Sequence, residues 1–313
     1  PTPDGQGSIT AQNKVLTASE AKQQVTSDDS LKAIMQASAE YNGKNVDVKV
    51  NSNSHLSDIK AGKVNTNGYE IIFSMDADNN PQTVMDNQVI TKKLYVVPDG
   101  SAITPDTKGF ISAEEIWYRS ADAIENFKED KFIYSNMYGL AVYDGQTLDY
   151  DGTKVALTSA TLNEIKQGAI KDHDVQFNLN VAGQTASLTK KLHILPNSYV
   201  VTPDRFGYIN SSEPKSYDSE SAIQTFGGQN PSMLKDTLGI TAAYKGQDKT
   251  NDVTIEVPNW KDIQRGSPNK QGWTIDLSLN GGVAGTVNDE INKKIYLPII
   301  DKSDRATLRG LDD

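Results

Sequence analysis

The residues best suited by their chemistry to bind a ligand are aspartates that recur in one short motif. The string TPDTKGFIS begins at Thr104, returns as TPDRFGYIN at Thr202, and has a weaker copy, TPDGQGSIT, at Thr2. Calcium prefers carboxylate oxygens, so Asp106 and Asp204 are candidate ligands for calcium at the contacts between repeats. An aspartate after proline is also a good turn former, and the motif favours that structural role. Calcium is the one cofactor that the sequence suggests.

A second oxygen-rich segment, DADNNPQTVMDN, runs from Asp76 to Asn87. An EF-hand loop needs glycine at its sixth position and a bidentate glutamate at its twelfth. This segment has Pro81 and Asn87 at those positions. The sequence therefore predicts a polar hairpin loop here.

No set of residues points to catalysis. His55, His173 and His193 fall at different places in their repeats, and His193 stands where the other copies have tyrosine. We interpret His193 as a half-exposed strand residue, because a general base needs a positioned partner. The chain has no G-x-S-x-G, H-E-x-x-H, Walker or G-x-G-x-x-G string and no cysteine, and no carboxylate pair stands out among 41 acidic residues. We expect a protein that is not an enzyme.

Trp117 and Tyr118 are the candidate recognition residues. They lie in EEIWYRS, where the other copies have no tryptophan. Aromatic side chains anchor many binding surfaces. The alternative is that Trp117 covers the apolar interface between the first and second modules. Trp260 and Trp273 occupy repeat positions that hold Leu or Val in other copies and are expected in the core.

The sequence blocks that contain or flank these residues recur three times along the chain in the same order. After each TPD string come a helix-like piece, an Ala-x-Tyr-x-Gly string, an Ile turn closed by glycine, an alternating strand and a lysine doublet. The copies are SEAKQQV, SADAIENF and SESAIQTF; AEYNG, AVYDG and AAYKG; LSDIKAG, LNEIKQG and WKDIQRG; YEIIFSMD, VQFNLNV and WTIDLSLN; KKLYVVP, KKLHILP and KKIYLPI. This order predicts three modules, residues 1–101, 102–199 and 200–313, the last with a C-terminal tail.

Each block predicts a local structure. Serine or aspartate before an Ala-rich segment is typical of a helix N-cap, and Asn-Gly or Asp-Gly after the tyrosine is typical of a hairpin turn. We expect that tyrosine in the core, and the hairpin partners in the following VDVKV, KVALT and DVTIEV. The Ile turn is one helical turn with a glycine C-cap. Strict alternation predicts strands with one buried face.

The TPD string itself is expected to be a stiff joint between modules. Proline fixes φ and removes a donor, and the aromatic and isoleucine that follow, Phe110–Ile111 and Tyr208–Ile209, should begin the first strand of the next module. A short linker of this kind is stiffer than a Gly/Ser tether. We expect the modules to form an extended row.

Composition excludes several classes of partner. The net charge is -10 and the pI is about 4.9, which argues against nucleic acid and anionic membranes, since both require clustered Lys and Arg. No apolar run approaches the length of a membrane span, so no membrane insertion is expected within the segment. The chain begins at PTPDGQGS without a signal sequence, and we interpret it as a mature or excised segment.

The layout of the copies resembles the bacterial Ig-like repeats that stand in tandem on Gram-positive surface proteins, adhesins and S-layer-type components. Many short strands with turn signals between them predict antiparallel β-sandwich modules, and the resemblance implies a mainly β fold of three tandem Ig-like β-sandwich modules. The sequence adds short helical insertions to each module. The helix near the start of each copy and the I-K-x-G turn are not part of a minimal Ig sandwich, so α+β modules are the alternative. The resemblance to bacterial surface repeats also implies an extracellular location on the bacterial cell surface.

Some modules of this kind carry a lysine isopeptide crosslink, which needs a buried, neutral lysine. The lysine doublets stand near the module ends, where such a lysine would lie. Adjacent lysines on a strand point to opposite faces, and solvent exposure is the commoner state.

The expected function is that of a non-enzymatic surface segment whose modules project another part or bind a ligand through loops and joints. Its partner would be a host or cell-wall glycan or protein. One alternative is a self-assembling S-layer-type coat subunit, which would associate with itself. Another is a set of accessory modules of a cell-wall-active enzyme.

Overall fold

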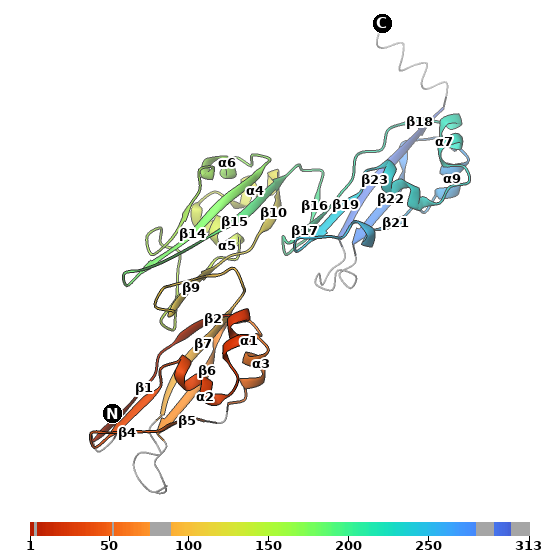
Figure 1. Ribbon diagram of the computed structural model, residues 1–313. Helices are drawn as coiled ribbons and strands as arrows, with labels where there is room; N and C mark the ends of the chain where they lie inside the picture. Colours follow the sequence, from red (N-terminus) through yellow and green to blue (C-terminus); the bar gives the residue numbers. More distant parts are fainter. Residues whose placement is uncertain (3–4, 52, 76–88, 280–290, 302–313) are drawn as a thin grey trace. The chain divides into compact units, whose positions relative to one another are not determined.

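The computed structural model describes residues 1–2, 5–51, 53–75, 89–279 and 291–301 (Figure 1). The fold is mainly β, with three repeating modules that each contain two sheets and short helices. The predicted hairpin loop from Asp76 to Asn87 lies outside the described residues, as does Asp4 of the first TPD string.

The first module pairs a three-stranded sheet, β1-β3-β4, with a four-stranded sheet, β2-β7-β6-β5. The strands are β1 Gly7–Thr10, β2 Lys14–Thr17, β3 Ser38–Tyr41, β4 Lys44–Val46, β5 Val48–Val50, β6 Asn65–Met75 and β7 Val89–Val97; the helices are α1 Ala18–Gln24, α2 Asp28–Ile34 and α3 Leu56–Lys60. Helix α1 contacts β2, β7 and α3, and α2 contacts β5. The helices therefore pack on the four-stranded sheet (Figure 1).

The second module repeats this plan with sheets β12-β11-β9-β8 and β10-β15-β14-β13. The strands are β8 Ala102–Ile103, β9 Gly109–Ser112, β10 Ile116–Arg119, β11 Leu140–Tyr143, β12 Gln146–Leu148, β13 Val155–Thr158, β14 Asp172–Val181 and β15 Gln184–Leu195; the helices are α4 Ser120–Asn126, α5 Asp130–Asn136 and α6 Leu162–Lys166.

The third module has sheets β16-β17-β19-β20 and β18-β23-β22-β21. The strands are β16 Val200–Val201, β17 Gly207–Asn210, β18 Tyr217–Asp218, β19 Thr241–Tyr244, β20 Gln247–Asp248, β21 Thr254–Glu256, β22 Asn269–Leu279 and β23 Ile291–Ile300; the helices are α7 Ser219–Phe226, α8 Leu234–Thr237, α9 Trp260–Gln264 and the 3-10 turns η2 Pro231–Met233 and η3 Thr250–Asp252.

The expectation of purely antiparallel sheets is wrong at one edge of each module. Strands β2, β10 and β18 run parallel to β7, β15 and β23. A parallel pair needs a long crossover, and nearly a whole module separates the two strands of each pair. Local sequence patterns carry no information about the direction of so distant a partner.

The predicted hairpin partners are also corrected. The turns are tight hairpin turns, with positive φ at both Asp144 and Gly145, as the type I′ turn requires. However, the partner of β11 is the short strand β12, while KVALT forms β13 and pairs with β14 in the other sheet. The chain thus crosses from one sheet to the other directly after each hairpin.

The predicted helices are confirmed. Helix α4 forms in SADAIENF and α7 in SESAIQTF, where the Asp218 carboxylate accepts from the Ser221 amide at 2.7 Å. The glycine that closes each Ile turn, Gly62, Gly168 and Gly266, has positive φ, as a helix C-cap of this type requires. A second short helix in each module, α2, α5 and α8, was not predicted.

Alternation along the long strands builds the cores. In β14 every second side chain from His173 to Leu179 is buried, and the corresponding residues of β6 and β22 join the apolar clusters of the first and third modules. Trp260 and Trp273 are partly buried and pack against the third cluster. No described helix has both the length and the apolar character needed to cross a lipid bilayer.

The contacts between residues divide the chain into two compact units, with a boundary that passes through the middle module. Unit 1 contains residues 1–114, 126–162 and 174–191, and unit 2 contains residues 115–125, 163–173 and 192–313. The second TPD turn, with its surroundings, lies in unit 1, and the third lies in unit 2. The three predicted module ranges stay a prediction.

Candidate functional site

The prediction that the TPD string connects two modules is wrong, because the string is the loop of a hairpin within one sheet. In the second module it connects β8 to β9, whose residues Ile103 and Phe110 pair. The Thr104 amide donates to the Gly109 carbonyl at 2.9 Å, and the Gly109 amide donates to Thr104 Oγ1 at 2.9 Å. The third module repeats both bonds between Thr202 and Gly207. The threonine, 1% and 0% exposed in these two copies, therefore closes the loop from inside.

The aspartate of the motif is engaged through both of its oxygens. Asp106 Oδ1 accepts from Thr104 Oγ1 at 2.6 Å and from the Lys108 amide at 3.0 Å, and Oδ2 accepts from the Tyr143 hydroxyl at 2.5 Å. Asp204 makes the same set of bonds, including one to the Tyr244 hydroxyl. The recurring tyrosine of Ala-x-Tyr-x-Gly thus bonds the recurring aspartate of TPD.

These bonds shift the pKa of the Asp106 carboxyl and the pKa of the Tyr143 hydroxyl. Partial burial of Asp106 opposes ionisation, but the bonds from Thr104, Tyr143 and the Lys108 amide outweigh it and lower the pKa of the carboxyl. The bond to Asp106, together with burial, raises the pKa of Tyr143 to about 12. The pair is therefore a carboxylate and a neutral phenol at neutral pH.

The glycine that ends the TPD motif allows the tyrosine ring to lie close to the backbone. A Cβ at Gly109 would come within 2.7 Å of the Tyr143 ring, and one at Gly207 within 2.9 Å of the Tyr244 ring. Real side chains do not tolerate such contacts, so only glycine fits. Tyr244 is buried at 2% exposure, as expected for the core, whereas Tyr143 is half-buried.

The predicted calcium ligands Asp106 and Asp204 therefore serve within their own turns. Among the described residues, no group of three or more acidic or histidine side chains is placed to hold a metal ion. Calcium at the joints stays a prediction.

The first joint, in unit 1, is a contact between strand β2 and the second TPD turn. The Val15 amide donates to the Thr107 carbonyl at 2.8 Å. Thr107 adopts positive φ, at 60°, in the turn that exposes this carbonyl. Around the bond lies a buried apolar cluster made of Val15, Tyr95, Val97, Phe110 and Val142.

The second joint, in unit 2, repeats the backbone contact. The Trp117 amide donates to the Arg205 carbonyl at 2.9 Å, and Arg205 has a φ of 68°. The strand registers make the positions equivalent, because Val15 pairs with Tyr95 in β7 and Trp117 pairs with His193 in β15. The same bond therefore joins successive copies twice.

Side chains on the other edge of the second joint form an ionic group. The Arg205 guanidinium lies 4.2 Å from the centre of the Tyr118 ring, within cation–π range. Asp122 accepts from Arg119 at 3.0 Å and from Arg205 at 3.5 Å. The bond from Arg119 contributes most to lowering the pKa of Asp122.

The candidate recognition residues are both covered. Trp117 is 9% exposed and Tyr118 is 3% exposed. The Trp117 ring stacks on His193 with centroids 4.6 Å apart, and Tyr208 lies against it at 6.4 Å. Since Tyr208 belongs to β17, Trp117 packs toward the third module and not, as the structural alternative had it, between the first and second. Their role in ligand recognition stays a prediction.

His193 has a more specific environment than the sequence indicated. Its Nε2 lies 2.5 Å from Glu115 Oε1 and its Nδ1 lies 2.5 Å from Asp172 Oδ1. The side chain is only 12% exposed, while the Asp172 side chain is 62% exposed. Glu115 stands two residues before Trp117 in EEIWYRS and was the residue in the sequence that could have indicated a partner for the histidine. Asp172 comes from a different strand and could not be paired with the histidine from the sequence.

A hollow of about 520 Å³ lies beside this histidine within unit 2. Its lining also includes two tyrosines, Tyr199 and Tyr208, and the carboxylate of Asp248 in β20. The residues that matter here are Glu115, Trp117, Asp172, His193, Tyr208 and Asp248.

The other two histidines have structural roles. His173 is 1% exposed and its Nε2 lies 2.9 Å from the Ala169 carbonyl. His55 contacts the Tyr69 ring at a centroid distance of 5.4 Å.

One doublet lysine is buried. Lys293 is 5% exposed, and its ammonium donates to the Ser198 carbonyl at 2.7 Å and to the Ser211 carbonyl at 3.2 Å. Burial lowers the pKa of Lys293, and the Glu213 carboxylate acts in the opposite direction. The isopeptide crosslink stays a prediction.

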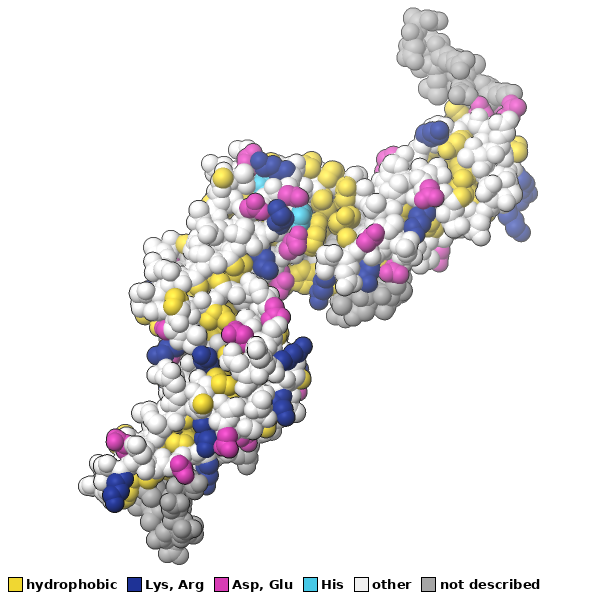
Figure 2. Space-filling model, viewed as in Figure 1, with side chains coloured by type: hydrophobic (Ala, Val, Ile, Leu, Met, Phe, Trp, Pro, Cys, Tyr) yellow, Lys and Arg dark blue, Asp and Glu magenta, His cyan; other side chains and the backbone are white. Residues whose placement is uncertain are grey.

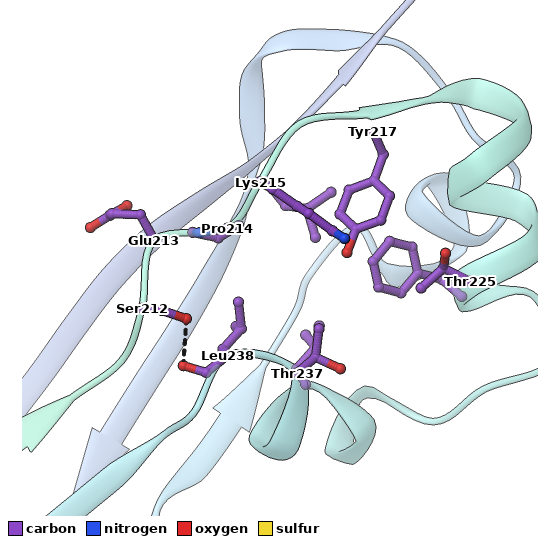
Figure 3. A pocket seen from close by; sticks show the side chains of 11 residues that line it. Ser212, Glu213, Pro214, Lys215, Tyr217, Thr225, Thr237 and Leu238 are labelled. Carbon is purple, nitrogen blue, oxygen red and sulfur yellow. Dashed lines mark hydrogen bonds between the residues drawn. The ribbon is translucent and has the colours of Figure 1, made fainter.

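Figure 3 shows a second hollow, of about 470 Å³, in the third module. Lys215 extends across it toward Tyr217, with its ammonium 5.6 Å from the ring centre. The apolar residues beneath, Phe226, Leu234 and Leu297, are at most 1% exposed. Because these side chains already cover one another, a ligand would find little apolar surface, and we assign the hollow no function.

No protein-family model matches the chain, and no curated protein matches it. The resemblance to bacterial surface repeats therefore depends on the order of the blocks. The structure adds that these blocks form three β modules of one plan.

Proposed function

We propose that the chain is a non-enzymatic segment of an extracellular bacterial surface protein, in which tandem modules act as a spacer. The observation that carries this proposal is the repeated joint. At both joints an edge-strand amide of one module donates to the carbonyl of the TPD turn of the next, at 2.8 and 2.9 Å. Identical connection of successive copies is what a spacer needs.

The chemistry of the turn supports this role. The donor and acceptor are both backbone groups, so the contact tolerates a change from Val15 to Trp117 beside it. The left-handed residue, Thr107 or Arg205, sits in a loop already held by the threonine, aspartate and tyrosine bonds. Such a joint docks the next module with few free torsions.

The distribution of charge is consistent with an array that stays in solution. On the face shown in Figure 2, basic and acidic side chains are scattered singly or in small groups. An excess of acidic residues, with a net charge of -10, disfavours self-association and binding to polyanions. The partner that we propose is a cell-wall or host glycan or protein, bound through loops or joints.

The absence of cysteine from the natural sequence allows a direct test of docking. Spin labels at Lys60→Cys and Lys154→Cys would lie on exposed positions of unit 1, one in each module beside the first joint. A docked joint predicts a narrow distribution of label distances, which broadens after Pro105→Gly with Asp106→Gly. A broad distribution in the chain without these glycines would contradict the spacer.

Solution scattering over a range of concentrations tests the remaining alternatives. A compact globule of this length has a radius of gyration of about 20 Å, and the spacer predicts a clearly larger value that does not change with concentration. Concentration-dependent growth would favour the coat subunit instead. Sedimentation with purified wall polymer then separates a wall-binding accessory segment from a simple spacer.

A further inference from the structure

The second joint contains a titratable group that the first joint lacks. His193 stands where the first module has Tyr95, and both face the equivalent strand residue, Trp117 or Val15. Asn13 occupies the position of Glu115 and bonds the Lys93 amide and Asp144. Only the second of these joints therefore places an imidazole between two carboxylates.

The two contacts of the ring depend on its protonation. An ionised carboxylate can only accept hydrogen bonds, and the oxygens of Glu115 and Asp172 each lie 2.5 Å from a different ring nitrogen of His193. Both contacts are hydrogen bonds only when both nitrogens carry hydrogen, that is, when the ring is an imidazolium. A neutral ring would turn a nitrogen lone pair toward one carboxylate, and that contact would open.

The ring is also in contact with the joint itself. Trp117 stacks on it with an interplanar angle of 13°, an arrangement that favours a cation over an indole face. The same residue donates its amide to the Arg205 carbonyl. A change at the ring therefore acts on the residue that forms the backbone contact between copies.

The other ionisable groups around the ring either favour its positive charge, because they are negative, or do not affect it. Asp248 lines the same hollow and adds negative charge, as do Glu115 and Asp172. Tyr199 and Tyr208 complete the ionisable lining, and burial raises the pKa of Tyr208. Lys171, next to Asp172, pairs with Glu164 at 2.9 Å.

We propose that His193 binds a proton that holds the second joint closed, so that this joint loosens as the pH rises while the first joint does not. The proton leaves a ring nitrogen for water, and the carboxylate facing that nitrogen loses its hydrogen bond. Histidine is the side chain that changes charge between about pH 5 and 8. The second joint is therefore stabilised while the ring is charged, and it loses this stabilisation as the ring is neutralised.

The test uses the whole chain and compares the amide hydrogen exchange of Trp117 with that of Val15. The intrinsic exchange of both amides accelerates equally with pH. The ratio of their exchange rates therefore reports only the difference between the two joints. We expect the exchange of Trp117 relative to Val15 to rise about tenfold across the titration of the ring, as for the loss of one charge-assisted hydrogen bond. The ring nitrogens of His193, followed by NMR, should report the same midpoint.

Two variants make the outcome decisive. His193→Tyr installs the residue of the first joint and should leave the ratio constant with pH. Asp172→Asn, at an exposed position, replaces one carboxylate with a neutral amide and should move the midpoint to lower pH. A constant ratio in the natural chain, or a pH-dependent ratio that survives His193→Tyr, would overturn the proposal.

Discussion

The two joints share a backbone contact and differ in the side chains around it. The first, in unit 1, surrounds the bond from Val15 to Thr107 with apolar groups. The second, in unit 2, surrounds the bond from Trp117 to Arg205 with a stacked imidazole, carboxylates and a guanidinium. The difference teaches that the TPD turn carries the docking, while the neighbouring side chains are free to set how the joint responds to its surroundings.

The largest expected effect comes from the tyrosine that bonds the turn. Tyr244→Ala should lower the free energy of unfolding by about 3 kcal/mol, because it deletes a buried aromatic side chain and the donor to Asp204. Tyr143→Ala should cost less, since Tyr143 is half-buried. Denaturant unfolding of the two variants measures the order. A larger loss at Tyr143 would show that burial does not decide the strength of this contact.

The next effect concerns the side chain at which the joints diverge. Trp117→Val installs the residue of the first joint and should cost about 2 kcal/mol, because the space filled by the indole beside His193 and Tyr208 is left open. Thermal unfolding checks the loss. Trp117→Phe is the matched control and should cost less; an equal loss would indicate that the indole does not pack as described.

The turn aspartate should produce a pH-dependent effect of about 1 to 2 kcal/mol. The pKa of Asp106 is lowered in the folded chain, so its contribution is present above the unfolded value, about 3.9, and is lost as the pH falls through the lower folded value. The melting temperature of Asp106→Asn should therefore lie below that of the natural chain at neutral pH and approach it in acid. A gap that persists in strong acid would exclude the carboxylate as its cause.

The smallest effect is expected from the ion pair beside the second joint. Asp122→Asn should cost less than about 1 kcal/mol, since pairs with partial solvent exposure contribute little. Asp29→Asn, at a position 86% exposed in its pair with Lys32, is the control and should leave the melting temperature unchanged. A cost at Asp122 comparable to that of Trp117→Val would make the ionic edge, rather than the indole, the main support of this joint.

The sequence predicted what is local and repeated. The hairpin turn at Asp144 and Gly145, the helix in SADAIENF and the strands that begin at Gly109 and Gly207 all follow from residue order, because capping, positive φ and alternation act over a few residues. Their threefold repetition separates them from chance patterns.

The sequence did not predict what depends on distant partners. The parallel pairing of β10 with β15 joins strands from opposite ends of a module, and the contact of His193 with Asp172 joins two strands whose register is not written locally. The bond of Tyr143 to Asp106 has the same character, although both residues recur in register. Repetition identified these residues as important without showing that they touch.

The most direct test of the account is the exchange of two backbone amides, those of Val15 and Trp117, in the whole chain near neutral pH. If TPD turns dock successive modules, both amides exchange more slowly than unbonded surface amides. Pro105→Gly with Asp106→Gly should then release Val15 and leave Trp117 as it was. Fast exchange of either amide in the natural chain, or protection of Val15 that is unchanged by the two glycines, would contradict the central claim that the turn holds the joint.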